Sequence, residues 1–157
     1  QHRIARLVVQ KLFGTVTGKR LAVLGFAFKA DTNDTREAPA IRICGDLLEE
    51  GAQLAIHDPK VEPAQMARDL KQEAAAAADA LSGTGSWALA ESVEEAVSGA
   101  DAVLILTEWN DYRQLNWAEL AGRMRKPAWL FDARAVADPE AVRTAGLTLW
   151  RVGDGEG

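Results

Sequence analysis

The sequence predicts an α/β fold in which a mostly parallel sheet of about six strands carries helices on both faces. Short apolar runs alternate along the chain with segments in which apolar side chains recur at helical spacing. The apolar runs are continuous, as in strands that are buried on both faces of a parallel sheet. A chain of 157 residues, 48% of them hydrophobic, can form one core and is too short for two ordinary domains. The expected architecture is therefore a Rossmann-like, doubly wound domain.

The first half of the chain predicts two helices and two strands. Before the first strand, apolar side chains recur at helical spacing at Ile4, Leu7, Val8, Leu12 and Phe13. We expect residues 1–18 to be the tail of a longer helix and residues 20–26 to form a buried strand. Pro39 can occupy the first turn of the next helix, which Gly51 terminates, and residues 53–57 form the second strand.

Alanine dominates the middle of the chain. Residues 63–81 have high helix propensity but little apolar bulk, which predicts a helix on the outside of the sheet. Residues 82–86 are expected to end this helix as a loop. Further strands are expected at 87–89, 102–106, 128–131 and 147–152, the last at an edge, and further helices at 93–97 and 117–125.

The connection after the first strand, residues 25–39, is the most informative segment. Backbone amides that hold a dinucleotide pyrophosphate need the spacing Gly-x-Gly-x-x-Gly, and this connection has only Gly25. It offers instead the ammonium of Lys29 and the guanidinium of Arg36, which suit phosphate as a point charge and as a planar fork. Asp58 ends the second strand, but without the glycine fingerprint a ribose-binding role is not favoured. The composition predicts a phosphate held by side chains.

Three connections are expected to meet at one edge of the sheet. Residues 26–36, 107–109 and 132–134 each follow a predicted strand, and the carboxyl ends of parallel strands lie at the same edge. Ligands of open α/β sheets bind in the crevice beyond that edge. We therefore expect Lys29 and Arg134 to face one binding site.

Charge and composition disfavour several function classes. The net charge of -5 argues against nucleic-acid binding, which needs a basic face. The sequence contains no secretory signal and no apolar run that could span a bilayer, so we expect a cytoplasmic protein that does not bind membranes. Cys44 is the single cysteine, cannot form an internal disulfide and is expected to be buried. The spacing of His, Cys and carboxylate residues predicts no metal site.

Several motifs follow one another along the chain. They are Gly-Phe-Ala-Phe-Lys at 25–29, Asp-Thr-x-Asp-Thr-Arg-Glu at 31–37, His-Asp-Pro-Lys-Val at 57–61, Thr-Glu-Trp at 107–109, Lys-Pro-Ala at 126–128 and Phe-Asp-Ala-Arg at 131–134. In this order they resemble the C-terminal UDP-binding domain of UDP-glucose 6-dehydrogenases, in the UDP-glucose/GDP-mannose dehydrogenase family. The resemblance extends from about Arg3 to about Gly153.

The resemblance implies the nucleotide-sugar-binding domain of an NAD-dependent enzyme that oxidises UDP-glucose to UDP-glucuronate in two steps, through an adduct on a cysteine. In the family that cysteine and the NAD fingerprint lie in the central and N-terminal domains. We therefore expect residues 19–157 to be the UDP-sugar-binding domain, residues 1–18 to be the tail of the central dimerisation helix, and no catalytic residue here. Expected partners are UDP-glucose or UDP, the N-terminal NAD-binding domain and further copies of the full-length protein. This chain alone is expected to be inactive.

The resemblance also implies roles for individual side chains. Phe28 and Lys29 match a pair that contacts the nucleotide sugar, through apolar contact and charge-assisted hydrogen bonds. Arg134 matches an arginine on the uridine side of the substrate, and Arg36 matches one that reaches NAD on the other domain. Family members often have glycine where this chain has Ala133, and if that position needs positive φ, alanine costs about 1 kcal/mol of strain.

Other roles stay open for the same segments. Arg36 lies among acidic residues that include Asp34, so a local salt-bridge network is an alternative role. Thr35 or Asp34 is a candidate cap for the following helix. Glu108 and Trp109 are expected to pack and to anchor their loop. For the whole protein, a family member acting on GDP-mannose or UDP-N-acetyl-mannosamine is one alternative, and a stand-alone nucleotide-binding or assembly module is another.

Overall fold

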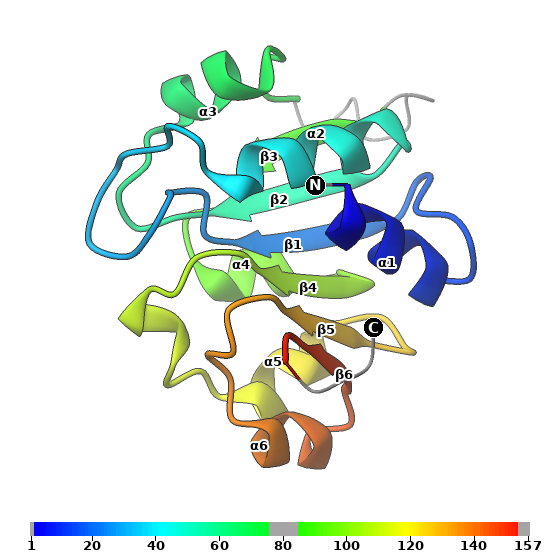
Figure 1. Cartoon of the computed structure of the whole chain (residues 1–157). Helices are drawn as coiled ribbons and strands as arrows, with labels where there is room; N and C mark the ends of the chain where they lie inside the picture. Colours follow the sequence, from blue (N-terminus) through cyan, green and yellow to red (C-terminus); the bar gives the residue numbers. More distant parts are fainter. Residues whose placement is uncertain (1, 76–84, 154–157) are drawn as a thin grey trace.

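The computed structural model describes residues 2–75 and 85–153. Within these ranges, six parallel strands form one sheet (Figure 1). The strands are β1 (Arg20–Leu24), β2 (Gln53–His57), β3 (Ser86–Leu89), β4 (Ala102–Ile105), β5 (Trp129–Asp132) and β6 (Thr148–Arg151). Their spatial order is β3-β2-β1-β4-β5-β6, the order of a doubly wound Rossmann fold. The predicted fold class is confirmed, including the edge position of β6.

Helices lie on both faces of this sheet. They are α1 (Arg3–Lys11), α2 (Pro39–Glu49), α3 (Pro63–Leu70), α4 (Val93–Val97), α5 (Trp117–Arg123) and α6 (Pro139–Thr144), with the 3-10 helix η2 (Asn110–Tyr112) after β4. α1 packs against α2 on one face, and α4 packs against α5 on the other (Figure 1). Because both faces are covered, every residue of β4 is buried, which explains its continuous apolar sequence.

The alanine-rich segment differs from its prediction. α3 ends at Leu70, well before the predicted end, because Lys71 takes a left-handed backbone conformation with a φ of 56°. The chain then runs beside β3, where the Ala75 N–H donates to the carbonyl of Trp87. Trp87 is only 1% exposed, and its indole N–H donates to the Gln72 carbonyl (2.8 Å), so the chain after α3 is tied to β3. The rest of the predicted helix and most of the predicted loop fall in residues 76–84, outside the described part.

Two smaller differences lie elsewhere. Phe13 follows α1 with a φ of 68° and is 78% exposed, so it does not belong to the apolar face of that helix. Helix α6 was not predicted, although the sequence contains its start signals. The Asp138 side chain accepts a hydrogen bond from the Glu140 N–H, and Pro139 takes the first helical position.

The single cysteine lies inside the fold. Cys44 lies in α2 and is fully buried, and this burial raises the pKa of its thiol to about 12. The predicted core role of Cys44 is confirmed.

Within the described ranges, the structure has no helix of the length and apolarity needed to cross a membrane.

Candidate functional site

The strand order reverses between β1 and β4, and ligands of such sheets bind at this switch point. Three loops follow the strands here: the β1 loop (residues 25–38), the β4 loop (residues 106–109) and the β5 loop (residues 133–138). Because β1, β4 and β5 are neighbouring parallel strands, the three loops leave the same edge of the sheet (Figure 1). The predicted convergence of the connections is confirmed. That Lys29 and Arg134 face one binding site stays a prediction.

Asp58, directly after β2, fixes the start of the β1 loop. Its Oδ2 accepts hydrogen bonds from the backbone N–H groups of Phe26 (2.7 Å) and Ala27 (3.0 Å), and from the indole N–H of Trp109 (3.1 Å). Its Oδ1 accepts from the backbone N–H groups of residues 60–61. Asp58 therefore joins the ends of three strands. Trp109 is 3% exposed, and its predicted anchoring role is confirmed.

Gly25 lets the β1 and β4 loops approach each other closely. Its φ is 100°, and a Cβ at this position would lie 2.4 Å from the Cβ of Thr107. The buried Thr107 hydroxyl donates to the Ala27 carbonyl (2.8 Å). In glycine-rich dinucleotide sites, the backbone N–H groups at this turn face the pyrophosphate. Here the N–H groups of Phe26 and Ala27 donate to the Asp58 carboxylate instead. The β1 turn is therefore not a backbone cradle for a dinucleotide.

The middle of the β1 loop is exposed. The Phe28 N–H donates to the Asp34 carbonyl (2.8 Å) and closes the loop on itself. The Phe28 side chain is 43% exposed, and Lys29 is exposed with no hydrogen bond or ion pair to any residue in 2–75 or 85–153. Asp31 and Glu37 have φ values of 68° and 58°, so the backbone is strained on both sides of the loop tip. The loop presents an apolar ring beside a cation.

Arg36 is paired within its own loop. Its Nε and Nη2 donate to the two carboxylate oxygens of Asp34 at 3.0 and 2.9 Å, and its side chain is 88% exposed. The hydrogen bond from the guanidinium lowers the pKa of the Asp34 carboxyl to about 2. The predicted local salt bridge is thus present. The predicted helix cap is wrong, because the N-cap of α2 is Ala38 and the Thr35 hydroxyl donates instead to Asp69 of α3 (2.6 Å).

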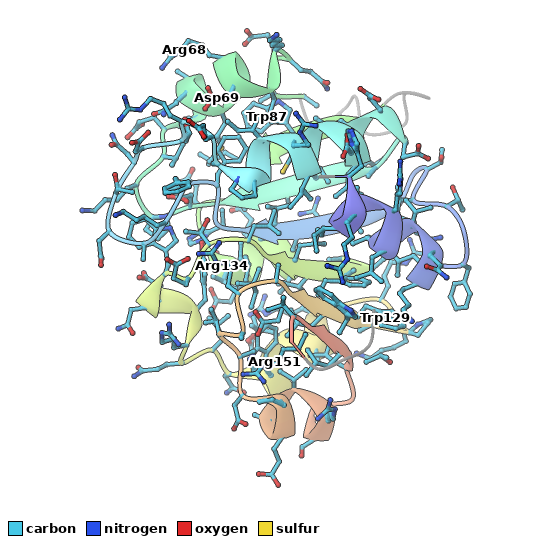
Figure 2. All side chains as sticks on the ribbon, in the orientation of Figure 1. Arg68, Asp69, Trp87, Trp129, Arg134 and Arg151 are labelled. Carbon is cyan, nitrogen blue, oxygen red and sulfur yellow. The ribbon has the colours of Figure 1, made fainter. Side chains whose placement is uncertain are left out.

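Arg134 lies at the ends of β4 and β5, where Figure 2 labels it. Its Nη2 is 2.6 Å from Oε1 of Glu108, on the neighbouring β4 loop, and a third of its side chain is exposed. The fully buried Asp132 shapes the β5 loop. Its Oδ1 accepts from the Arg134 N–H, and its Oδ2 accepts from the N–H groups of residues 136–137. The β5 loop is therefore pinned along most of its length.

The strain considered for Ala133 lies elsewhere in the β5 loop. Ala133 does not have positive φ, whereas Ala135 has a φ of 56°. The hydrogen bonds from residues 136–137 to Asp132 bend the chain back at Ala135. The strain of a left-handed residue that has a Cβ, about 1 kcal/mol, therefore applies to Ala135 and not to Ala133.

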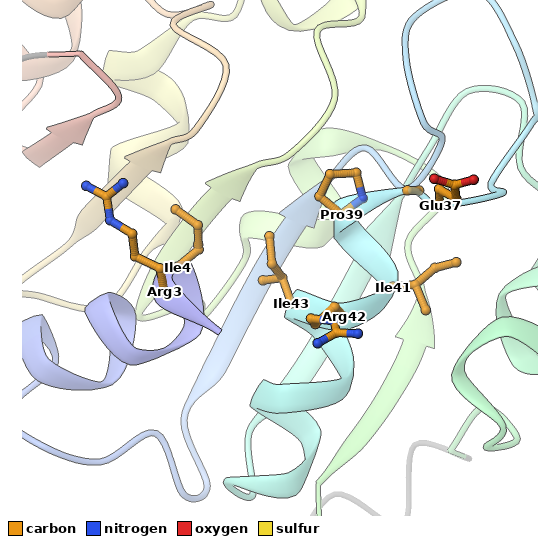
Figure 3. Close-up of a pocket in the computed structure, with 8 residues that line it drawn as sticks. Arg3, Ile4, Glu37, Pro39, Ile41, Arg42 and Ile43 are labelled. Atoms are coloured by element: carbon orange, nitrogen blue, oxygen red, sulfur yellow. The ribbon is translucent and has the colours of Figure 1, made fainter. Parts of the chain in front are cut away.

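A hollow of about 890 Å³ lies between the starts of α1 and α2 (Figure 3). Its lining residues are Arg3, Ile4, Glu37, Ala38, Pro39, Ile41, Arg42 and Ile43. Phe28, Lys29 and Arg134 are not among them. The candidate site is therefore supported by the convergence of the loops and not by this hollow.

Sequence reasoning missed the organising roles of two aspartates and one ion pair. Asp58 and Asp132 each lie at the end of an apolar strand, and that position is a usable signal, because a carboxylate there can accept N–H groups of the following turn. The pairing of Glu108 with Arg134 has no local signal, because α5 separates the two residues in the chain. In the described ranges, no three His, Cys, Asp or Glu side chains are grouped to hold a metal ion.

Comparison with known proteins gives a family and close sequence relatives. Residues 22–139 match the family described as "UDP-glucose/GDP-mannose dehydrogenase family, UDP binding domain". The chain is 42% identical to "UDP-glucose 6-dehydrogenase 2" of Oryza sativa subsp. japonica, over 96% of this chain and 33% of that protein. The chain thus spans about a third of the length of the curated relatives that it matches.

Solved structures support the same fold. The UDP-D-ManNAc dehydrogenase from Pyrococcus horikoshii superimposes with a TM-score of 0.71 at 24% identity, over 99% of this chain and 31% of that one. An NDP-N-acetyl-D-galactosaminuronic acid dehydrogenase from Methanosarcina mazei gives a TM-score of 0.73 at 22% identity, over 97% of this chain and 28% of that one. With its fold and motifs, this chain therefore belongs to the UDP-glucose/GDP-mannose dehydrogenase family, as its UDP-binding domain.

Proposed function

We propose that this domain binds the nucleotide sugar of an NAD-dependent UDP-glucose 6-dehydrogenase, which oxidises UDP-glucose to UDP-glucuronate in two steps through a cysteine adduct formed outside this chain. The observation that carries the proposal is the meeting of the β1, β4 and β5 loops at the switch point, with Lys29 and Arg134 on two of them. The family match supports UDP as the nucleotide, and the names of the relatives support glucose as the sugar.

Three side chains are proposed to contact the substrate. Phe28 provides apolar contact and Lys29 provides charge-assisted hydrogen bonds to the nucleotide sugar, while Arg134 contacts the uridine side. The exposure of Phe28 and Lys29 supports these roles, because neither side chain is committed inside the fold. Nη2 of Arg134 lies 2.6 Å from Oε1 of Glu108, and the guanidinium donates no hydrogen bond within the described residues, so its N–H donors remain for a ligand.

NAD is proposed to be held mainly by an N-terminal domain outside this chain. The residues present do not fit a resident dinucleotide, because Asp58 engages the first amides of the β1 turn. Arg36 is proposed to reach NAD from the β1 loop by exchanging Asp34 for a phosphate, and its exposure supports that exchange. The homo-oligomer of the full-length protein, the cytoplasmic location and the inactivity of this chain alone stay predictions.

A different nucleotide sugar is the second candidate. The family description includes GDP-mannose, and a structural neighbour is named for UDP-D-ManNAc. A stand-alone nucleotide-binding or assembly module without chemistry of its own is the alternative from another class. The base and the sugar of the ligand therefore need separate tests.

Calorimetric titration of this chain with UDP, UDP-glucose and GDP tests the proposal. We expect UDP and UDP-glucose to bind and GDP not to bind. Lys29→Ala should weaken binding by about tenfold, because a charge-assisted hydrogen bond is lost. Lys11→Ala, on α1, is the matched control and should bind as the wild type does.

Two results would contradict the proposal. Binding of GDP with the affinity of UDP would exclude a uridine site. Failure of all three ligands to bind both this chain and the full-length protein would exclude a nucleotide site at this edge. Turnover of the full-length protein with UDP-glucose and NAD, compared with UDP-N-acetyl-mannosamine, then decides the sugar.

A further inference from the structure

Glu108 has a buried carboxylate oxygen that accepts no hydrogen bond from the described residues. This oxygen, Oε1, lies 2.6 Å from Nη2 of Arg134, close enough for an ion pair although the two groups are not aligned as a hydrogen bond. The side chains are 29% and 33% exposed, so solvent screens this pair less than it screens a fully exposed one. The Glu108 carboxylate is therefore balanced mainly by one guanidinium.

Both residues of this pair stand on fixed backbone. Glu108 lies between Thr107 and Trp109, which are buried and donate side-chain hydrogen bonds to neighbouring segments of the sheet edge. The backbone N–H of Arg134 donates to Oδ1 of Asp132 at 3.2 Å. The register of β4 against β5 therefore sets where the carboxylate meets the guanidinium.

We propose that Glu108 is a positioning residue for nucleotide binding, which holds the guanidinium of Arg134 at the binding edge before the ligand arrives. This inference rests on the proposed function. A guanidinium has N–H donors in a rigid plane, and in the described residues that of Arg134 lies beside Glu108 without donating a hydrogen bond, so donors remain available to ligand oxygens. An arginine that is already fixed loses less rotamer freedom when the ligand binds.

The other cations proposed for the site are held differently. Arg36 pairs with Asp34 two positions away in the same loop, so that pair does not tie the guanidinium to the sheet. Lys29 has no acidic partner within hydrogen-bond reach in the described ranges. Arg134 is held by an acid from the neighbouring β4 loop, which gives its charged group a place defined by the fold.

Glu108→Gln tests the proposal, because it keeps the shape of the side chain and removes its charge. We expect the affinity of the chain for UDP to fall about tenfold in this variant. In NMR spectra of the ligand-free chain, rotation of the Arg134 Nη2 group about the Cζ–Nη2 bond should be slow in the wild type and faster in Glu108→Gln. Glu108→Asp, which retains the charge on a shorter stem, should recover part of both properties.

The comparison in an Arg134→Ala background separates positioning from a general structural role. If Glu108 acts through Arg134, adding Glu108→Gln to Arg134→Ala causes no further loss of UDP affinity. Glu119→Gln removes the acid of the Glu119–Arg123 pair on α5 and is the matched control, with unchanged UDP binding expected. Thermal unfolding of each variant checks that it is folded.

Two outcomes overturn the proposal. UDP binding that is unchanged or tighter in Glu108→Gln would make the carboxylate a spectator or a competitor of the ligand. A further loss in the double variant would show that Glu108 acts on the loop as a whole. If neither this chain nor the full-length protein binds UDP, the proposed function fails, whereas the rotation of the Arg134 Nη2 group still decides whether Glu108 fixes Arg134.

Discussion

The β1 loop and the β5 loop leave the same edge of the sheet, and a buried or nearly buried aspartate organises each of them, yet they are held differently. Asp132 is the last residue of the strand before its own loop and accepts backbone N–H groups along that loop. Asp58 directly follows the neighbouring strand β2 and holds only the start of the β1 loop, at Phe26 and Ala27. The first arrangement fixes a short loop, whereas the second fixes the base of a longer one.

This difference separates two kinds of cation at the proposed site. The β5 loop presents Arg134 from a fixed backbone, with its side chain held by Glu108. The β1 loop presents the exposed side chains of Lys29 and Arg36 beyond its anchored base, and its later part is tied to α3 where Thr35 donates to Asp69. A site of this kind combines a preset contact with contacts that can adapt to the ligand.

The largest expected effect comes from removing the two aspartates. Asp58→Ala should lower the free energy of unfolding by about 4 kcal/mol, and Asp132→Ala by about 2 kcal/mol, because buried N–H groups lose their acceptors in both variants. Asp58 accepts five hydrogen bonds from three segments, whereas Asp132 accepts three from one loop. Urea denaturation measures both values. Equal losses, or a larger loss for Asp132→Ala, would break the comparison.

A smaller effect is expected at the turn of the β5 loop. Ala135→Gly should raise the free energy of unfolding by up to about 1 kcal/mol, because glycine relieves the strain of a left-handed residue. Ala133→Gly is the matched control two positions earlier. It should slightly lower stability, because glycine there only adds freedom to the unfolded chain. Thermal and urea unfolding measure the stability of both variants. If the two substitutions changed stability in the same direction, the strain would not lie specifically at Ala135.

The smallest effect on stability is expected from the exposed pair of the β1 loop. Because the pKa of Asp34 is lowered in the folded chain, its stabilising contribution is fully present above pH 3.8 and is lost as the pH falls toward 2. In Arg36→Ala, an NMR titration should show the pKa of Asp34 returning toward 3.8, with no resolvable change in unfolding at neutral pH. An Asp34 pKa that stays low would mean that another group holds the carboxylate.

Much of the fold follows from consecutive residues. The strands at 20–26, 53–57 and 102–106 were predicted to within one or two residues, because burial on both faces leaves an uninterrupted apolar run. The alternation of helices and strands predicted the parallel sheet, and therefore the meeting of the loops that carry Lys29 and Arg134.

Only the tertiary structure decided how these loops are held. The chain after α3 is tied to β3 by hydrogen bonds with Trp87, and the anchoring of the β1 loop depends on Asp58, which lies more than thirty residues away in the chain. The pairing of Glu108 with Arg134 depends on β4 lying beside β5. Helical period and strand apolarity are local properties that the sequence displays directly. The side-by-side order of parallel strands brings together residues from distant segments, and no short stretch of sequence encodes those contacts.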